Sequence, residues 1–164
     1  MRQIIQQREI VADTLRYPGE EPAPGTRPVQ PYAEFLSAAI AGAATAAAAE
    51  GIAILIGPTD EVESLTPYLG AVNLIVIDFP KAGDGRGFSQ ARMLRQRGRY
   101  RGELRAHGVL KRDQLFFLAR AGFDSFDLDP AEDLLAALAA FDTFSVAYQA
   151  ASNELVHVHQ REPV

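Results

Sequence analysis

Short apolar stretches alternate with helical patterns through most of the chain. Four stretches have the length and composition of buried strands: residues 51–57, 73–79, 102–108 and 123–128. Each is followed by a segment with helical spacing: residues 60–70, 88–98, 111–122 and 130–141. Strands that alternate with helices of this length are typical of parallel βα units. The pattern therefore predicts an α/β fold with repeating strand–helix units, in which a mainly parallel sheet is flanked by helices. Four units are too few to close an eight-stranded barrel, so we expect an open or half-barrel-like sheet.

The remaining segments add smaller elements to this frame. Apolar and polar residues alternate loosely along residues 1–17, which predicts one or two short strands. Residues 18–31 are rich in Pro, Gly and Glu and predict an extended connector. Residues 32–50 are dominated by alanine and predict a helix that Gly51 ends. Two more β-prone stretches follow, at residues 144–149 and 154–159. The length of 164 residues is that of one ordinary domain, so we interpret residues 1–164 as a single α/β domain.

Composition excludes several kinds of chemistry. The chain is 48% hydrophobic and 23% charged, as folded globular proteins are. It contains no cysteine, which excludes disulfides, thiolate metal sites, thiol nucleophiles and cysteine-bound iron–sulfur clusters. No apolar stretch near the N-terminus has the length of a signal peptide or a membrane span, and no nucleic-acid-binding motif is present. We therefore expect a cytoplasmic protein that binds neither membrane nor nucleic acid, with no cofactor evident.

Charge is distributed unevenly along the chain. Residues 81–122 contain eleven Lys or Arg and three acids, whereas the rest contains five basic and eighteen acidic residues. This asymmetry predicts a basic face suited to an anionic ligand or an acidic partner. The alternative is that these arginines cover exposed helix faces and pair with acids elsewhere in the fold.

The loop at residues 80–87 joins a predicted strand to a predicted helix and is rich in glycine. Ligands of α/β sheets bind beyond the carboxyl ends of the strands, where glycines and a helix N-terminus leave backbone N–H groups free. Arg86 adds a planar donor fork that matches sulfite, sulfate, phosphate or carboxylate, and Asp84 could orient it. In the structural alternative Ser89 caps the helix and Arg86 only pairs with Asp84. Phe88 stands where a dinucleotide-binding loop has its third glycine, so this loop does not match that fingerprint.

Polar residues alternate along the third predicted strand. Glu103, Arg105 and His107 share one face of it, because successive side chains of a strand point to opposite sides. Buried charges on a sheet need partners, so either this strand lies at an edge or its polar face meets Asp78 and Asp127 of neighbouring strands. In the second case these polar side chains form either a structural network or the lining of a pocket. His107 is the histidine placed where acid–base chemistry would be natural.

Further polar residues fall near the same predicted rim. Arg112, Asp113 and Gln114 open the third predicted helix, and Asp113 joins His107 as a candidate for proton transfer. His157 and His159 share one face of a predicted strand, but no third ligand is evident, and we predict no metal site.

Residues 84–124 carry a run of motifs that resembles the bacterial domain of unknown function 934 family. The family's D-G-R-G-[FY]-S motif falls on Asp84, Gly85, Arg86, Gly87, Phe88 and Ser89. Its L-R motif falls on Leu94 and Arg95, and its G-E-L-R-A motif falls on residues 102–106. Its R-D-Q motif falls on Arg112, Asp113 and Gln114. Its R-x-G-F-D motif falls on Arg120, Gly122, Phe123 and Asp124. The resemblance covers about residues 51–149. The chain departs from the family pattern at four positions: Ala82, Gly83, His107 and Val109, the last of which replaces a family acid.

The resemblance implies a role in sulfur metabolism. Proteins of that family are described as probable oxidoreductases of sulfite reduction, and their genes commonly neighbour those of assimilatory sulfite reductase and phosphoadenylylsulfate reductase. The chain itself has no redox motif. Our first hypothesis is thus an accessory protein of assimilatory sulfite or sulfate reduction that binds an anion or an acidic partner through an Arg-rich rim. The partner would be sulfite reductase or another enzyme of sulfur assimilation.

A second hypothesis makes the protein an enzyme acting on a small anionic substrate at the carboxyl ends of the strands. Arg86 and Arg105 would then hold the anion, and His107 or Asp113 would move protons. The binding residues that we predict under either hypothesis are Asp84, Arg86, Ser89, Arg95, Arg105, Arg112 and Gln114. Exposed sheet edges and the small side chains of residues 32–50 also favour a two-fold homodimer.

Overall fold

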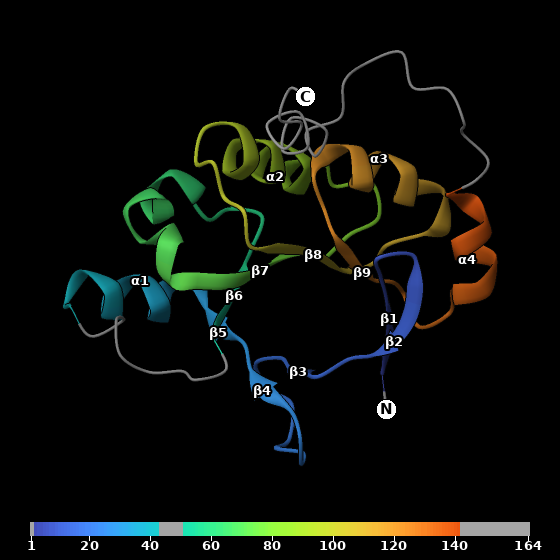
Figure 1. The fold of residues 1–164 in the computed structure, drawn as a ribbon, viewed down its shortest axis with the longest axis horizontal. Helices are drawn as coiled ribbons and strands as arrows, with labels where there is room; N and C mark the ends of the chain where they lie inside the picture. Colours follow the sequence, from blue (N-terminus) through green and yellow to red (C-terminus); the bar gives the residue numbers. More distant parts are fainter. Residues whose placement is uncertain (1, 43–50, 142–164) are drawn as a thin grey trace, which may run out of the picture.

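A seven-stranded sheet runs through the protein (Figure 1). The computed structural model describes residues 2–42 and 51–141. In sheet order the strands are β2 (Glu9–Ala12), β1 (Gln3–Gln6), β9 (Ser125–Asp127), β8 (Glu103–Gly108), β7 (Val72–Phe79), β6 (Ile52–Ile56) and β5 (Gln30–Pro31). The helices are α1 (Tyr32–Ile40), α2 (Arg86–Gln96), α3 (Leu115–Ala121) and α4 (Leu134–Ala140), with two 3₁₀ helices, η1 (Val62–Ala71) and η2 (Arg112–Gln114).

Strand direction confirms the predicted fold class. Neighbouring strands from β5 to β9 are parallel, whereas β1 is antiparallel to both β9 and β2. The sheet is open, with β2 at one edge and β5 at the other, and does not close into a barrel. The N-terminal hairpin therefore completes a mainly parallel sheet.

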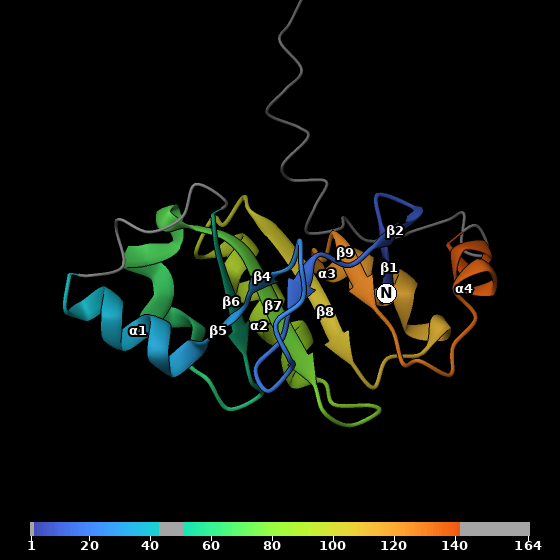
Figure 2. The same cartoon turned by 90° about the horizontal axis from the view of Figure 1, so that it is seen from below.

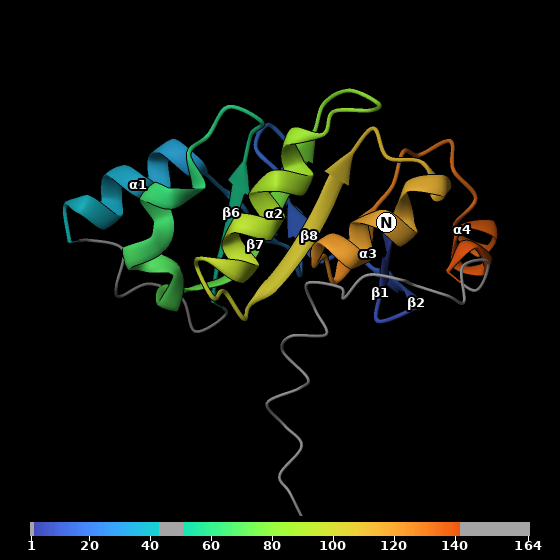
Figure 3. The ribbon, with the colours of Figure 1, turned by 90° about the horizontal axis from the view of Figure 1, so that it is seen from above.

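The helices α2 and α3 cover one face of the sheet (Figure 3). Alternate residues of the central strands point toward them, such as Ile75 and Ile77 of β7 and Leu104 of β8, each at most 1% exposed. Leu94 of α2 and Leu118 of α3 pack against the same cluster. Burying one such side chain contributes about 1.5–3 kcal/mol, so this layer is the main apolar core.

The N-terminal segment covers the opposite face (Figure 2). Two short parallel strands, β3 (Leu15–Arg16) and β4 (Arg27–Pro28), form a separate two-stranded sheet there. Side chains of this segment pack against side chains of β6 and β7 in a second buried cluster: Leu15, Tyr17, Val29, Ala53, Leu74 and Val76. The prediction of a plain extended connector at residues 18–31 was therefore wrong in part, because β4 and β5 lie inside it. These two-residue strands form only because distant segments, β3 and β6, supply their hydrogen-bond partners.

Helix boundaries differ from the predicted ones at prolines and caps. Pro67 lies inside η1, which is a 3₁₀ helix, since proline lacks the N–H that an α-helix interior needs. The last helix begins at Leu134, where the Asp133 carboxylate accepts hydrogen bonds from the first turn. The predicted elements at residues 43–50, 144–149 and 154–159 lie outside the described residues. No described helix has the length and apolar character needed to cross a membrane.

Candidate functional site

Three titratable side chains lie in a row near the carboxyl ends of neighbouring parallel strands. The register pairs Asp78 of β7 with His107 of β8, and His107 with Asp127 of β9. All three side chains project from the face that the N-terminal segment covers, since Ile77 and Ala106, which alternate with them, belong to the helix-side core. The strand register therefore places Asp78 and Asp127 on either side of His107, as expected for the polar face of β8.

His107 holds a defined position in this row. Its Nδ1 lies 2.7 Å from Oδ2 of Asp127, and the Tyr17 ring stacks on the imidazole with centroids 4.1 Å apart. The guanidinium of Arg2 lies over the outer side of the Tyr17 ring, 4.8 Å from its centroid. Because a carboxylate only accepts, Nδ1 carries the proton of this hydrogen bond, which leaves Nε2 as the nitrogen available for proton transfer. Partial burial raises the pKa of Asp78, against the opposing influence of His107.

Arg105 lies at the centre of a buried ionic network on the same face. Its guanidinium donates to Asp13 at 2.7 Å, to Glu103 at 3.0 Å and to the Ser125 hydroxyl at 3.1 Å. Ser125 in turn donates to Glu103 at 2.6 Å. Only 4% of Arg105 is exposed, so its charge is used within the fold. Asp13, the closest carboxylate, was not predicted from the sequence.

Arg95 is also held internally. Its guanidinium donates to the carbonyl oxygens of Tyr100, Gly102 and Gly122 at 2.8–2.9 Å and to the Asp124 carboxylate at 2.5 Å. These acceptors lie in the turn before β8 and in the turn before β9. Arg95 therefore fastens two turns to the end of α2.

The predicted anion loop after β7 is open to solvent. The Arg86 side chain donates to both carboxylate oxygens of Asp84, at 3.0 and 2.6 Å, as expected for an oriented arginine. This pairing lowers the pKa of Asp84 to about 2. The helix begins at Arg86 with Gly85 at its N-cap, so Ser89 is an exposed residue of the first turn rather than the cap.

Replacing Arg86 by alanine is expected to raise the pKa of Asp84 from about 2 towards its ordinary value of 3.8. The guanidinium is the largest cause of the shift, whereas the hydrogen bond from the Arg86 backbone N–H remains in the variant. An NMR titration of the Asp84 carboxyl carbon measures this change. A midpoint that stays at about 2 in Arg86→Ala would show that the pairing does not exist in solution.

The remaining predicted residues, Arg112, Asp113 and Gln114, lie in η2 after β8. Gln114 accepts from the Lys111 backbone at 3.0 Å, and the Arg112 backbone donates to Glu132 at 3.3 Å. Asp113 is exposed in the same 3₁₀ turn. The structure thus brings Asp84 together with Arg86, and His107 together with Asp127. Arg86 and Arg95 lie near opposite ends of α2, roughly 14 Å apart along its axis.

Residues 53–158 match a family described as bacterial protein of unknown function (DUF934). The chain belongs to this family. Comparison with curated proteins and with solved structures gave no match.

The DUF934 region does not contain the whole of the polar face just described. Glu103, Arg105 and His107 lie within it, whereas Asp13 and Tyr17, which contact them, precede residue 53. The N-terminal segment therefore contributes to the environment of the DUF934 residues. No local motif marks Asp13 as a partner, because Arg105 is 92 residues away in sequence.

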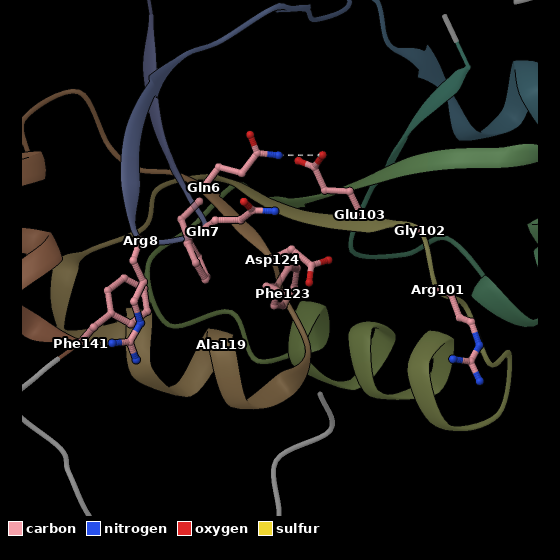
Figure 4. A pocket seen from close by; sticks show the side chains of 11 residues that line it. Gln6, Gln7, Arg8, Arg101, Gly102, Glu103, Ala119, Phe123, Asp124 and Phe141 are labelled. Carbon is pink, nitrogen blue, oxygen red and sulfur yellow. Dashed lines mark hydrogen bonds between the residues drawn. The ribbon is translucent and has the colours of Figure 1, made fainter. Parts of the chain in front are cut away.

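A hollow of about 540 Å³ lies at the opposite edge of the sheet, near the amino end of β8 (Figure 4). Its wall combines the β1–β2 turn, the start of β8 and the end of α3: Gln6, Gln7, Arg8, Arg101, Gly102, Glu103, Ala119, Phe123, Asp124, Phe126 and Phe141. This site was not predicted, since its residues come from four separate segments. Two of the family-like motifs, those at Glu103 and Asp124, reach it.

Proposed function

We propose that the protein is an accessory protein of assimilatory sulfite reduction that docks on an acidic partner through arginines at the end of α2. Four exposed arginines form this basic surface: Arg92, Arg97, Arg99 and Arg101. None of them forms an ion pair with an acid among residues 2–42 and 51–141, in a chain whose net charge is −5. This concentration of exposed positive charge is the observation that carries the proposal.

The physical argument is electrostatic. Exposed arginines within ten residues of one another create a local positive potential, whereas the rest of the chain is acidic. Such a surface speeds the encounter with a negatively charged protein and selects it over neutral or basic proteins. Binding of this kind weakens as salt is added, because the Debye length falls to about 8 Å at 0.15 M. Arg95 and Arg105 take no part, since their charges are used inside the fold.

The pathway rests on family membership. The resemblance stated above links DUF934 proteins to sulfite reduction, and the partner in our proposal is sulfite reductase or another enzyme of sulfur assimilation. The docking would take place in the cytoplasm. We include a two-fold homodimer in the proposal, with the sheet edge at β2 (Glu9–Ala12) available for pairing between copies.

A strain lacking the gene tests the proposal. We expect it to grow on cysteine or sulfide but not on sulfate as the sole sulfur source, since the block would lie at sulfite reduction. Normal growth on sulfate, without a second copy of the gene, would contradict the proposed pathway.

Complementation of this strain tests the surface. The variant Arg92→Glu/Arg97→Glu is expected to fold normally, to fail on sulfate, and to lose salt-sensitive co-purification of a sulfur-assimilation enzyme. Lys81→Glu is the matched control, because Lys81 is exposed in the loop at the other end of α2. Growth of the double variant, or equal failure of the control, would show that this surface is not the docking site.

The second candidate function is an enzyme that uses His107 for proton transfer. The Asp78–His107–Asp127 row favours it, because such a row orients a histidine at the strand ends. A groove of about 780 Å³ beside Asp127 argues against an enzyme that acts on an anionic substrate there. Its wall carries four carboxylates and one arginine: Asp127, Asp129, Glu132, Asp133 and Arg2. In the same complementation, His107→Gln supports growth if the protein docks, and fails if the histidine is catalytic.

A further inference from the structure

The groove beside Asp127 has an apolar wall that faces solvent. The groove, about 780 Å³ in volume, lies between the start of β1, the strand β2 and the loop from β9 to α4. Its apolar lining consists of Ile10, Leu128, Pro130, Leu134 and Leu135. Leu135, in the first turn of α4, is 72% exposed. Exposed apolar patches rimmed by polar residues mark sites of protein–protein contact, so this groove is a candidate docking site.

The rim of the groove carries negative charge that the fold does not balance. Asp129, Glu132 and Asp133 accept hydrogen bonds from backbone N–H groups. Within the described part of the chain, none of these three carboxylates forms an ion pair. The arginine of the groove, Arg2, pairs with other acids of the fold. The groove therefore offers three carboxylates beside an apolar wall and fits a cationic occupant.

A matching set of positive charges lies in the turn between α2 and β8. Arg97, Arg99 and Arg101 alternate along residues 97–101 and are exposed. Their guanidinium groups form no ion pair with an acid of residues 2–42 and 51–141. We call residues 97–101 the arginine turn. It carries three of the four arginines of the basic surface.

The backbone of the arginine turn is held in place from inside the fold. Arg95 donates to the carbonyl oxygens of Tyr100 and Gly102 at 2.8 and 2.9 Å, and Tyr100 is only 4% exposed. Arg99 has a φ of 50°, which residues with a Cβ disfavour, and strained positions of this kind cluster at functional sites. A turn that already has one conformation loses little conformational entropy when it binds.

The groove and the arginine turn lie at opposite edges of the sheet. The arginine turn leads into the amino end of β8, whereas the groove begins at the carboxyl end of the parallel strand β9. In Figure 3 the turn is at the lower edge and the loop from β9 to α4 is near the upper edge. The length of β8, roughly 20 Å, separates the two edges. A contact between the two surfaces therefore joins two copies of the chain.

We propose that the arginine turn of one copy docks in the groove of a second copy. Three arginines meet the three carboxylates, and the aliphatic stems of the arginines lie on the apolar wall around Leu135. The contact covers most of the surface through which the protein docks on its partner, so an acidic partner has to displace the second copy. The inference rests on the proposed docking function and names how the docking surface is regulated. It differs from a two-fold dimer through β2, in which both copies use the same edge.

Two variants that each disable one surface test the proposal. The turn variant is Arg97→Gln/Arg99→Gly, in which glycine is unstrained at a φ of 50°. The groove variant is Asp129→Asn/Glu132→Gln, in which the amide oxygens still accept the backbone hydrogen bonds. Both variants are expected to unfold at temperatures close to that of the unaltered protein, since neither removes an ion pair of the fold.

Biolayer interferometry at low salt compares the pairings of these variants. The groove variant in solution is expected to bind the immobilised turn variant, because one supplies the turn and the other the groove. Each variant is expected to bind to itself about tenfold or more weakly. The mixed pairing is expected to weaken by a similar factor in about 0.5 M NaCl, because salt screens exposed charges. Absence of mixed binding would overturn the proposal, and so would equal binding in all pairings, which is the result of a two-fold contact.

Matched controls show whether the position of the charges matters. Lys81 and Glu34 are exposed and lie outside both surfaces. Adding Lys81→Gln to the groove variant, or Glu34→Gln to the turn variant, is expected to leave the mixed pairing unchanged. A loss as large as that in the self-pairings would show that net charge alone drives the association, and would overturn the proposal.

Poly-glutamate tests whether the contact closes the docking surface. As a probe for an acidic partner, it is expected to compete for the arginine turn and to displace the groove variant from the immobilised turn variant. Uncharged polyethylene glycol of similar length is expected to have no effect. A mixed pairing that persists in excess poly-glutamate at low salt would refute the regulatory part of the proposal.

The outcomes also separate this proposal from the docking function. If Arg92→Glu/Arg97→Glu fails on sulfate but the mixed pairing does not bind, the basic surface stands and closure by a second copy is rejected. If the mixed pairing binds but Arg92→Glu/Arg97→Glu supports growth, the contact between copies stands and the docking function is rejected.

Discussion

Replacing Arg105 by methionine is expected to lower the free energy of unfolding by about 3–5 kcal/mol. Its guanidinium is 4% exposed and faces the carboxylates of Asp13 and Glu103. Methionine removes the positive charge that both acids face, and the buried Asp13 carboxylate loses its closest partner. Urea unfolding followed by circular dichroism measures the change.

A second substitution shows where this loss comes from. In Arg105→Met/Asp13→Leu the buried carboxylate of Asp13 is gone as well, so part of the stability is expected to return. Replacing one partner of a buried pair is more costly than replacing both by apolar groups. If Arg105→Met unfolds with almost unaltered free energy but fails to support growth, Arg105 serves a ligand and not the fold.

Arg95→Ala is expected to lower the free energy of unfolding by about 2–4 kcal/mol. Its guanidinium satisfies three backbone carbonyl oxygens and Asp124 at once, and alanine leaves all four acceptors without this donor. Arg95→Lys is expected to recover less than half of the loss, because an ammonium group lacks the planar fork.

Arg92 provides the control for this experiment. It lies one turn earlier on α2 and is exposed, so Arg92→Ala is expected to change the free energy of unfolding by less than about 0.5 kcal/mol. Equal effects of the two alanine variants would show that the internal hydrogen bonds of Arg95 contribute nothing to stability.

Local pattern was sufficient to predict the central strands and a mainly parallel sheet, although not the order of the strands. Buried parallel strands need apolar residues on both faces, and this requirement leaves a signal in the sequence of β6 and β7. The alternation of Glu103, Arg105 and His107 was also readable, because a strand has a period of two. The position of Asp127 beside His107 followed from two neighbouring parallel strands.

Long-range partners could not be predicted. The Asp13–Arg105 pair joins segments that no periodicity relates, and β3 and β4 consist of two residues each. Arg95 was predicted as a residue that binds an anion or a partner, and it instead donates to acceptors within the fold. The hydrogen bonds of Arg95 depend on the positions of the turns before β8 and β9. The spacing of residues along a helix does not show where those turns lie.

The buried pair between the N-terminal segment and β8 restricts how this sequence can change over time. Asp13 and Arg105 hold one another at 2.7 Å, so a mutation that removes either charge is harmful while the other remains. Loss of both together is much less harmful. In related chains these two positions should therefore be inherited as a matched set, opposite charges in some lineages and two apolar residues in others, with few mixed cases surviving.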